Sequence, residues 1–96
     1  MQLILDAITE KVGQANCKNL ATALQDFECV ANLGEVLPGD VEHSNKQMVK
    51  LARVFLNESV KYVSDKTPQM RAIMRLPIAI ISGIVRSEER RWLGCD

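Results

Sequence analysis

Apolar residues recur at helical spacing along almost the whole of this chain, and this pattern most constrains its fold. Within residues 17–33 they form a stripe with i, i+4, i+7 and i+11 spacing, made of Leu20, Leu24, Phe27 and Ala31. Such spacing places side chains on one face of a helix. Only residues 78–81 would tolerate a strand, and the chain offers no second strand with which they could pair. The sequence therefore predicts an all-α fold.

The length of the chain limits how these helices can be organised. A chain of 96 residues can bury one modest hydrophobic core and is too short for two. We expect a single helical domain over residues 1–96, folded as a compact bundle of four to five helices. The expected helices cover about residues 2–12, 17–33, 44–65, 68–76 and 77–91.

Local signals set the expected ends of the first three helices. Gly13 and Gly34 stand where a helix commonly ends on glycine, and Asn16 is a suitable N-cap for the second helix. Residues 37–40 read Leu-Pro-Gly-Asp, which is typical of a turn. Ser44 is followed three residues later by a glutamine, and this capping box would start the third helix.

The third helix is expected to lie at the centre of the bundle, because its apolar arc is broad. Its expected buried residues are Met48, Val49, Leu51, Ala52, Phe55, Leu56, Val60 and Val63. Its expected solvent-facing residues are Lys50, Arg53, Asn57, Lys61 and Ser64.

Pro77 interrupts the most apolar segment of the chain. A proline inside a helix removes one backbone hydrogen bond and clashes with the carbonyl four residues earlier, here that of Ile73, at a cost of about 3 kcal/mol. The sequence therefore predicts one of two arrangements. Either one kinked helix runs over residues 68–91, or a short helix ends near Arg75 and a second begins at Pro77.

The composition excludes several classes of function. The net charge is zero, so a broad, non-specific coating of nucleic acid is not expected. The longest apolar run, residues 76–85, is about half as long as a bilayer span requires, and no secretory signal opens the chain. We therefore expect no membrane association. An odd number of cysteines fits a reducing compartment, so the expected location is cytoplasmic.

Residues that carry chemistry are scarce. The chain lacks a glycine-rich phosphate loop, a G-x-S-x-G elbow and an H-E-x-x-H pair. Its three cysteines and one histidine match no metal-ligand spacing. We expect no enzymatic activity, no metal, no cofactor and no catalytic residue.

All six arginines lie after residue 52, and four of them can share one helical face. If residues 68–91 are helical, an arc of roughly 100° contains Arg71, Arg75, Arg86 and Arg90, with Ala79 and Ser82 between the two pairs. The other side of the segment is apolar and carries Met70, Ile73, Met74, Ile80, Ile81, Ile84 and Trp92. The candidate partner-binding residues are Arg71, Arg75, Ser82, Arg86, Arg90 and Trp92.

Several interpretations of these arginines stay open. Arginine is enriched at interface hot spots because its planar fork binds carboxylates and its stem buries apolar area, which favours a larger protein with an acidic surface. Alternatively, residues 1–42 carry seven acids and two lysines, so the arginines could pair within the molecule. Their internal partners would be Asp26, Glu28, Glu35 or Glu42, each pair contributing about 0–1 kcal/mol. Met70 and Met74 either fill the core or line an adaptable groove.

Residues 76–90 read LPIAIISGIVRSEER and resemble the end of the recognition helix in helix-turn-helix repressors, which often read I-S-x-I-x-R-G-E-R. The resemblance implies buried Ile81 and Ile84. The implied base-reading face is Pro77, Ile78, Ala79, Ser82, Gly83 and Arg86. In front of this stretch the pattern differs from the family: Arg71 falls where a small residue is needed and Arg75 where the turn glycine belongs.

The sequence thus predicts a small non-enzymatic helical interaction protein, a regulator or inhibitor. It would bind a larger protein partner through the basic and apolar region over residues 68–93. The alternative is a helix-turn-helix-like DNA-binding transcriptional regulator, which makes nucleic acid the less favoured partner. Self-association stays open.

Overall fold

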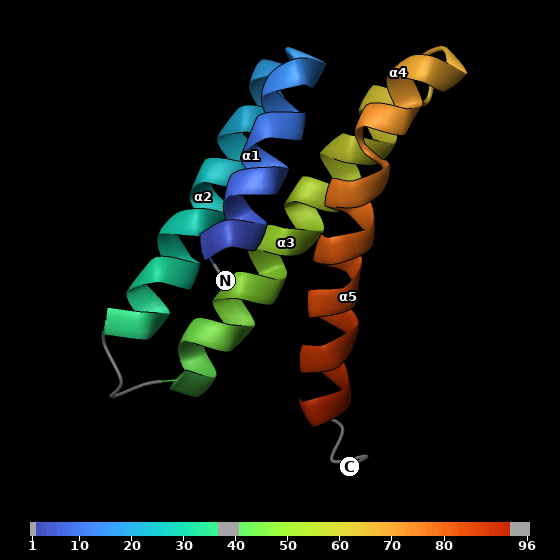
Figure 1. Ribbon diagram of the computed structural model, residues 1–96. Helices are drawn as coiled ribbons and strands as arrows, with labels where there is room; N and C mark the ends of the chain where they lie inside the picture. The colour runs from blue at the N-terminus through green and yellow to red at the C-terminus, as the bar shows by residue number, and fades with distance from the viewer. Residues whose placement is uncertain (1, 37–40, 93–96) are drawn as a thin grey trace.

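The computed structural model describes the backbone of residues 2–36 and 41–92 and the side chains of residues 5–30 and 46–90. The described residues form five helices and no strand, which confirms the all-α bundle (Figure 1). In chain order they are α1 (Gln2–Ala15), α2 (Lys18–Val36), α3 (Val41–Val63), α4 (Pro68–Ile73) and α5 (Arg75–Trp92).

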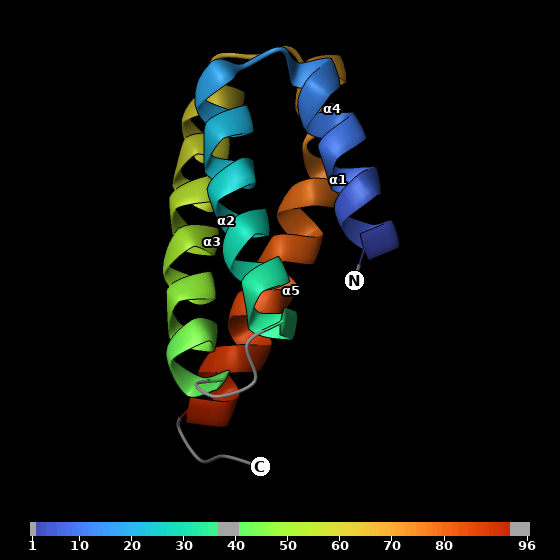
Figure 2. The same cartoon turned by 90° about the vertical axis from the view of Figure 1, so that its left-hand side faces the viewer.

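The three longest helices are α2, α3 and α5, and each runs antiparallel to the one before it (Figure 1). α2 and α3 make the most extensive contact, and α5 packs along the opposite side of α3. α1 contacts α2, α4 and α5, and it spans only the upper half of the bundle in Figures 1 and 2. As expected, α3 occupies a central position with a neighbour on each side.

The core is mainly aliphatic, with two fully buried aromatic side chains. Each helix except α4 contributes to it. The buried hydrophobic residues are Leu5, Ile8, Val12, Ala15, Leu20, Ala23, Leu24, Phe27, Val49, Ala52, Phe55, Met74, Ile81 and Val85. The predicted core positions Leu20, Leu24 and Phe27 on α2 and Val49, Ala52 and Phe55 on α3 are confirmed, because an i, i+3, i+4 pattern faces the neighbouring helices. Met48, Leu51, Leu56 and Val63 are only partly buried, and the side chain of Ala31 lies outside the described residues.

One core prediction on α3 is wrong. Val60 is 64% exposed, whereas its neighbour Ser59 is fully buried. The Ser59 hydroxyl donates to the Phe55 carbonyl one turn earlier, at 2.8 Å, so its polar group is satisfied within the helix. A buried serine therefore occupies the position next in register after Phe55, and Val60 lies about 100° further round the helix.

The junction between α1 and α2 also differs from the prediction. α1 continues past Gly13 to Ala15, and Asn16 adopts a left-handed backbone with φ of 52°. Its N–H donates to the Gly13 carbonyl at 3.2 Å. Asparagine tolerates this conformation better than most residues, so Asn16 ends α1 rather than capping α2.

Two other predicted boundaries are wrong. Gly34 lies inside α2, which extends to Val36. α3 begins at Val41, so Ser44 lies within the helix and is not its N-cap. The predicted turn over residues 37–40 lies outside the described residues.

The segment around Pro77 forms two helices, not one kinked helix. The break falls at Met74, the C-cap of α4, whose N–H donates to the Arg71 carbonyl at 3.1 Å. The Ile78 N–H then donates to the Met74 carbonyl at 3.0 Å. Pro77 therefore lies in the first turn of α5, where a missing N–H removes no helical bond. The break comes slightly earlier than the expected helices 68–76 and 77–91.

Candidate protein-interaction face

The four arginines lie on the outer side of α4 and α5. Arg71 is on α4, the other three are on α5, and all four side chains are exposed. On α5 the buried residues are Pro77, Ile81 and Val85. At about 100° per residue they lie opposite Arg75, Ala79, Arg86 and Arg90. We call the set Arg71, Arg75, Ala79, Ser82, Arg86 and Arg90 the arginine face; its Ser82 is partly exposed.

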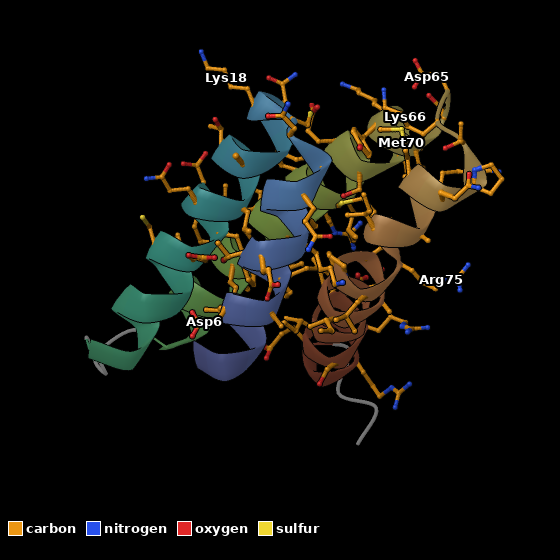
Figure 3. The ribbon with its side chains drawn as sticks, turned by 45° about the horizontal axis from the view of Figure 1, so that its top comes forward. Asp6, Lys18, Asp65, Lys66, Met70 and Arg75 are labelled. Atoms are coloured by element: carbon orange, nitrogen blue, oxygen red, sulfur yellow. The ribbon has the colours of Figure 1, made fainter. Side chains whose placement is uncertain are left out.

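Figure 3 shows the Arg75 side chain extending away from the bundle into solvent. Met70 lies in the same view at the end of the molecule that carries Asp65 and Lys66. The break at Met74 does not bury any of the four guanidinium groups. The predicted stripe is thus exposed, although it is divided between two helices.

Apolar residues border the arginine face. Leu76 is 44% exposed and Met70 is 41% exposed. Of the two roles considered for Met70 and Met74, core filling is therefore wrong for Met70 and is confirmed for Met74, which is fully buried. Ile80, Gly83 and Ile84 are partly exposed. Trp92 is the last residue of α5, and its side chain lies outside the described residues. A partner at this surface would therefore meet apolar groups beside positive charge.

Within the described part of the chain, none of the four arginine side chains forms an ion pair or hydrogen bond with another described residue. The acidic residues that the sequence offered as internal partners do not pair with these arginines where their side chains are described. Glu28 accepts a hydrogen bond from Thr9 at 2.7 Å, and Asp26 is exposed. The side chains of Glu35 and Glu42 lie outside the described residues. Among the described arginine side chains, Arg53 on α3 forms an ion pair, 2.5 Å from Glu89 of α5.

The position of Arg75 is unfavourable for the helix that carries it. Arg75 is the first residue of α5, and the first turn of α5 has no acidic residue. The N-terminus of a helix bears a partial positive charge, so a cation there destabilises the helix. The local structure therefore gives no stabilising reason for Arg75.

A hollow lies where the end of α3 meets α4 and the start of α5. It has a volume of about 350 Å³ and is lined by Val63, Pro68, Arg71, Arg75 and Ile78. Val63 and Ile78 are partly buried, whereas the other three are exposed. Two guanidinium groups therefore stand beside an apolar lining.

Sequence reasoning found the two arginines of this hollow and missed its apolar lining. Val63 was expected in the core, and residue 68 only begins the expected helix over residues 68–76. Their meeting depends on how the loop after α3 directs α4, for which the sequence has no periodic signal.

Other chemistry is sparse in the part of the chain that the structure covers. No group of three or more His, Cys, Asp or Glu side chains there could hold a metal ion. Among the described helices, none combines the length and apolar character needed to cross a membrane.

Comparison with protein-family models, with curated proteins and with solved structures finds no match for this chain.

Proposed function

We propose that this protein is a small non-enzymatic interaction protein of the cytoplasm, a regulator or inhibitor of a larger protein. It binds an acidic surface of that protein through the arginine face and the apolar residues beside it. The observation that carries this proposal is the set of four exposed arginines that make no ion pair within the described part of the chain.

The energetics favour a protein surface as the partner. A hydrogen bond to a charged group contributes about 1.5–3 kcal/mol when it is sheltered from water. The exposed apolar surface of Leu76, which follows Arg75 on α5, would supply that shelter. A carboxylate-bearing surface with apolar groups between its charges would therefore match both properties of this face.

A second copy of the chain is a poorer partner at this face. If two α5 helices packed in parallel, each arginine would meet its own equivalent. If they packed antiparallel about Gly83, the Arg75 end of one would meet the Arg90 end of the other. Both arrangements place like charges together, which is destabilising.

The DNA-binding alternative receives less support from the geometry. The implied base-reading face would need Pro77 and Ile78 to be accessible, but Pro77 is fully buried and Ile78 is partly buried. Met74 is also the single residue between α4 and α5, whereas a helix-turn-helix uses a turn of about three or four residues. DNA binding is therefore kept as an outcome of the test.

The test compares two variants of equal net charge. One variant changes Arg71, Arg75, Arg86 and Arg90 to Gln, and the control changes Lys18 and Lys50, both exposed and on α2 and α3, to Glu. Each takes the net charge from 0 to −4, since 0 − 4 = −4 in the first and 0 − 2 × 2 = −4 in the second.

Affinity purification from the native cell should recover a partner with the wild type and the lysine control and lose it with the arginine variant. Circular dichroism checks that each variant stays helical. If the folded arginine variant retains every partner, the proposal fails. A gel shift with random duplex DNA at low and moderate salt tests the alternative, because phosphate binding must weaken steeply with salt.

A further inference from the structure

The hollow between α3, α4 and α5 combines two arginine side chains with an apolar lining, and neither feature stabilises the fold. Its rim carries Arg71 of α4 and Arg75 of α5, which have no acidic partner among the described residues. Its remaining lining is Val63, Pro68 and Ile78, which offer no side-chain donor or acceptor. Two like charges at one small hollow repel each other unless an anion lies between them.

The size of the hollow limits what can enter. A volume of about 350 Å³ lies at the lower end of the range for small-molecule sites, and the hollow is open to solvent. It suits one side chain of a partner and the groups next to it. The apolar lining favours a hydrocarbon side chain, since burying it removes apolar surface from water on both sides.

The two guanidinium groups determine what must flank that side chain. Arginine forms paired, parallel hydrogen bonds with a carboxylate, and its long stem reaches around an apolar group. An aspartate or glutamate beside the inserted side chain would meet Arg71 or Arg75 at the rim. An acidic segment would also remove the repulsion between them.

We propose that this hollow is the anchoring pocket for an acidic peptide segment of the partner protein, which inserts one apolar side chain between Arg71 and Arg75 and places carboxylates on both. The inference rests on the proposed function and deepens it, because it names the recognised element. Arg86 and Arg90, further along α5, would contact the same partner outside the pocket.

A phosphate-bearing partner fits the pocket less well. Phosphate sites use backbone N–H groups and hydroxyl or amide side chains together with arginine. Beside the two arginines, the lining side chains are all apolar and include no hydroxyl or amide group. A phosphate would leave that apolar surface uncovered, whereas an apolar side chain with acidic neighbours covers it.

The test is a selection from a random-peptide phage library on the immobilised full chain. The expected sequences combine one large apolar residue with flanking Asp or Glu. A synthetic, fluorescein-labelled copy of the most enriched peptide is then measured by fluorescence polarisation. Arg71→Gln with Arg75→Gln should weaken its binding by about tenfold or more, since two charge-assisted contacts are lost. Arg86→Gln with Arg90→Gln is the matched control and should change it little.

The position of the peptide is read from the methyl resonances of Val63 and Ile78 by NMR, and these should shift most. The pocket inference is wrong if the largest methyl shifts lie elsewhere or if the selection enriches no peptide. It is also wrong if both pairs of substitutions weaken peptide binding equally. A further contrary result would be a phosphorylated version of the peptide that binds more tightly and no longer needs its apolar residue for binding.

Recovery of the cellular partner by affinity purification distinguishes failure of this inference from failure of the proposed function. If partner recovery is lost with Arg86→Gln and Arg90→Gln but kept with Arg71→Gln and Arg75→Gln, the arginine face still binds a protein and the pocket inference is wrong. If the variant with all four arginines changed to glutamine retains every partner, both are wrong.

Discussion

Replacing Arg75 by Glu should stabilise the fold while weakening partner binding. Arg75 is the first residue of α5, in a turn without acidic residues. A cation at that end of the helix is unfavourable by about 0.3–1 kcal/mol, and an anion is favourable by a similar amount. Arg and Glu have similar helix propensities, so the backbone preference changes little.

A second contribution comes from Arg71, which lines the same hollow. Two like charges beside one exposed hollow repel each other by about a few tenths of a kcal/mol, and Arg75→Glu would turn this repulsion into an attraction. Because the site is exposed and screened by solvent, we expect a net gain of about 1 kcal/mol in the free energy of unfolding. For a domain of this size, that corresponds to a rise in Tm of about 4–8 °C.

The assay is urea unfolding followed by circular dichroism at low ionic strength, since guanidinium chloride would screen the charges. The gain should shrink at high salt, because it is electrostatic. Arg86→Glu, further along the same helix, is the control and should change stability by less than about half as much. A loss of stability in the Arg75→Glu protein would refute the reasoning, since it would give Arg75 a role in folding.

Three further substitutions test the account of the fold by thermal or urea unfolding. Gly83→Ala should stabilise α5 by about 0.5–1 kcal/mol, because a Cβ there meets nothing within 4 Å; destabilisation would mean that the position is more crowded. Tyr62→Phe should cost about 0.5–1.5 kcal/mol by removing the hydrogen bond from its hydroxyl to the Ala15 carbonyl, 3.2 Å away, and an unchanged Tm would argue against that contact. Phe55→Ala should cost about 3–5 kcal/mol, since Phe55 is fully buried on the central helix; a loss below about 1 kcal/mol would contradict its place in the core.

The fold class followed from periodicity because the apolar pattern of α2 and α3 matches a helix over several turns. The core prediction from this pattern was wrong on α3, because hydrophobicity was the only criterion for burial. It placed Val60 in the core instead of Ser59, whose hydroxyl is satisfied by the carbonyl of Phe55. A serine that donates within its own helix leaves no signal in an apolar pattern.

The end of the first helix was mispredicted because two neighbouring residues, Gly13 and Asn16, are both suited to end a helix. Asn16 took the left-handed position that glycine usually holds, and α1 continued past Gly13. The break before Pro77 was predictable in kind, since proline favours the first turn of a helix. Its location at Met74 was not, because Met74 is fully buried and tertiary packing sets where the chain turns.

The candidate site was partly predictable. Spacing indicated that the four arginines could face one side, and they are exposed on α4 and α5. The hollow that joins Arg71 and Arg75 to Val63 was not predictable, because Val63 comes from another helix. Helical periodicity describes one element at a time and does not report which elements meet.

Photo-crosslinking in the native cell tests the central claim most directly. A photoreactive phenylalanine analogue replaces Ala79, an exposed residue of the arginine face on α5, and Thr22, an exposed residue on α2, serves as the control position. The account predicts a crosslink to a larger protein from position 79 that is lost when the four arginines are changed to glutamine, and none from position 22. A crosslink from position 22 alone, or one from position 79 that survives the loss of all four arginines, would contradict it.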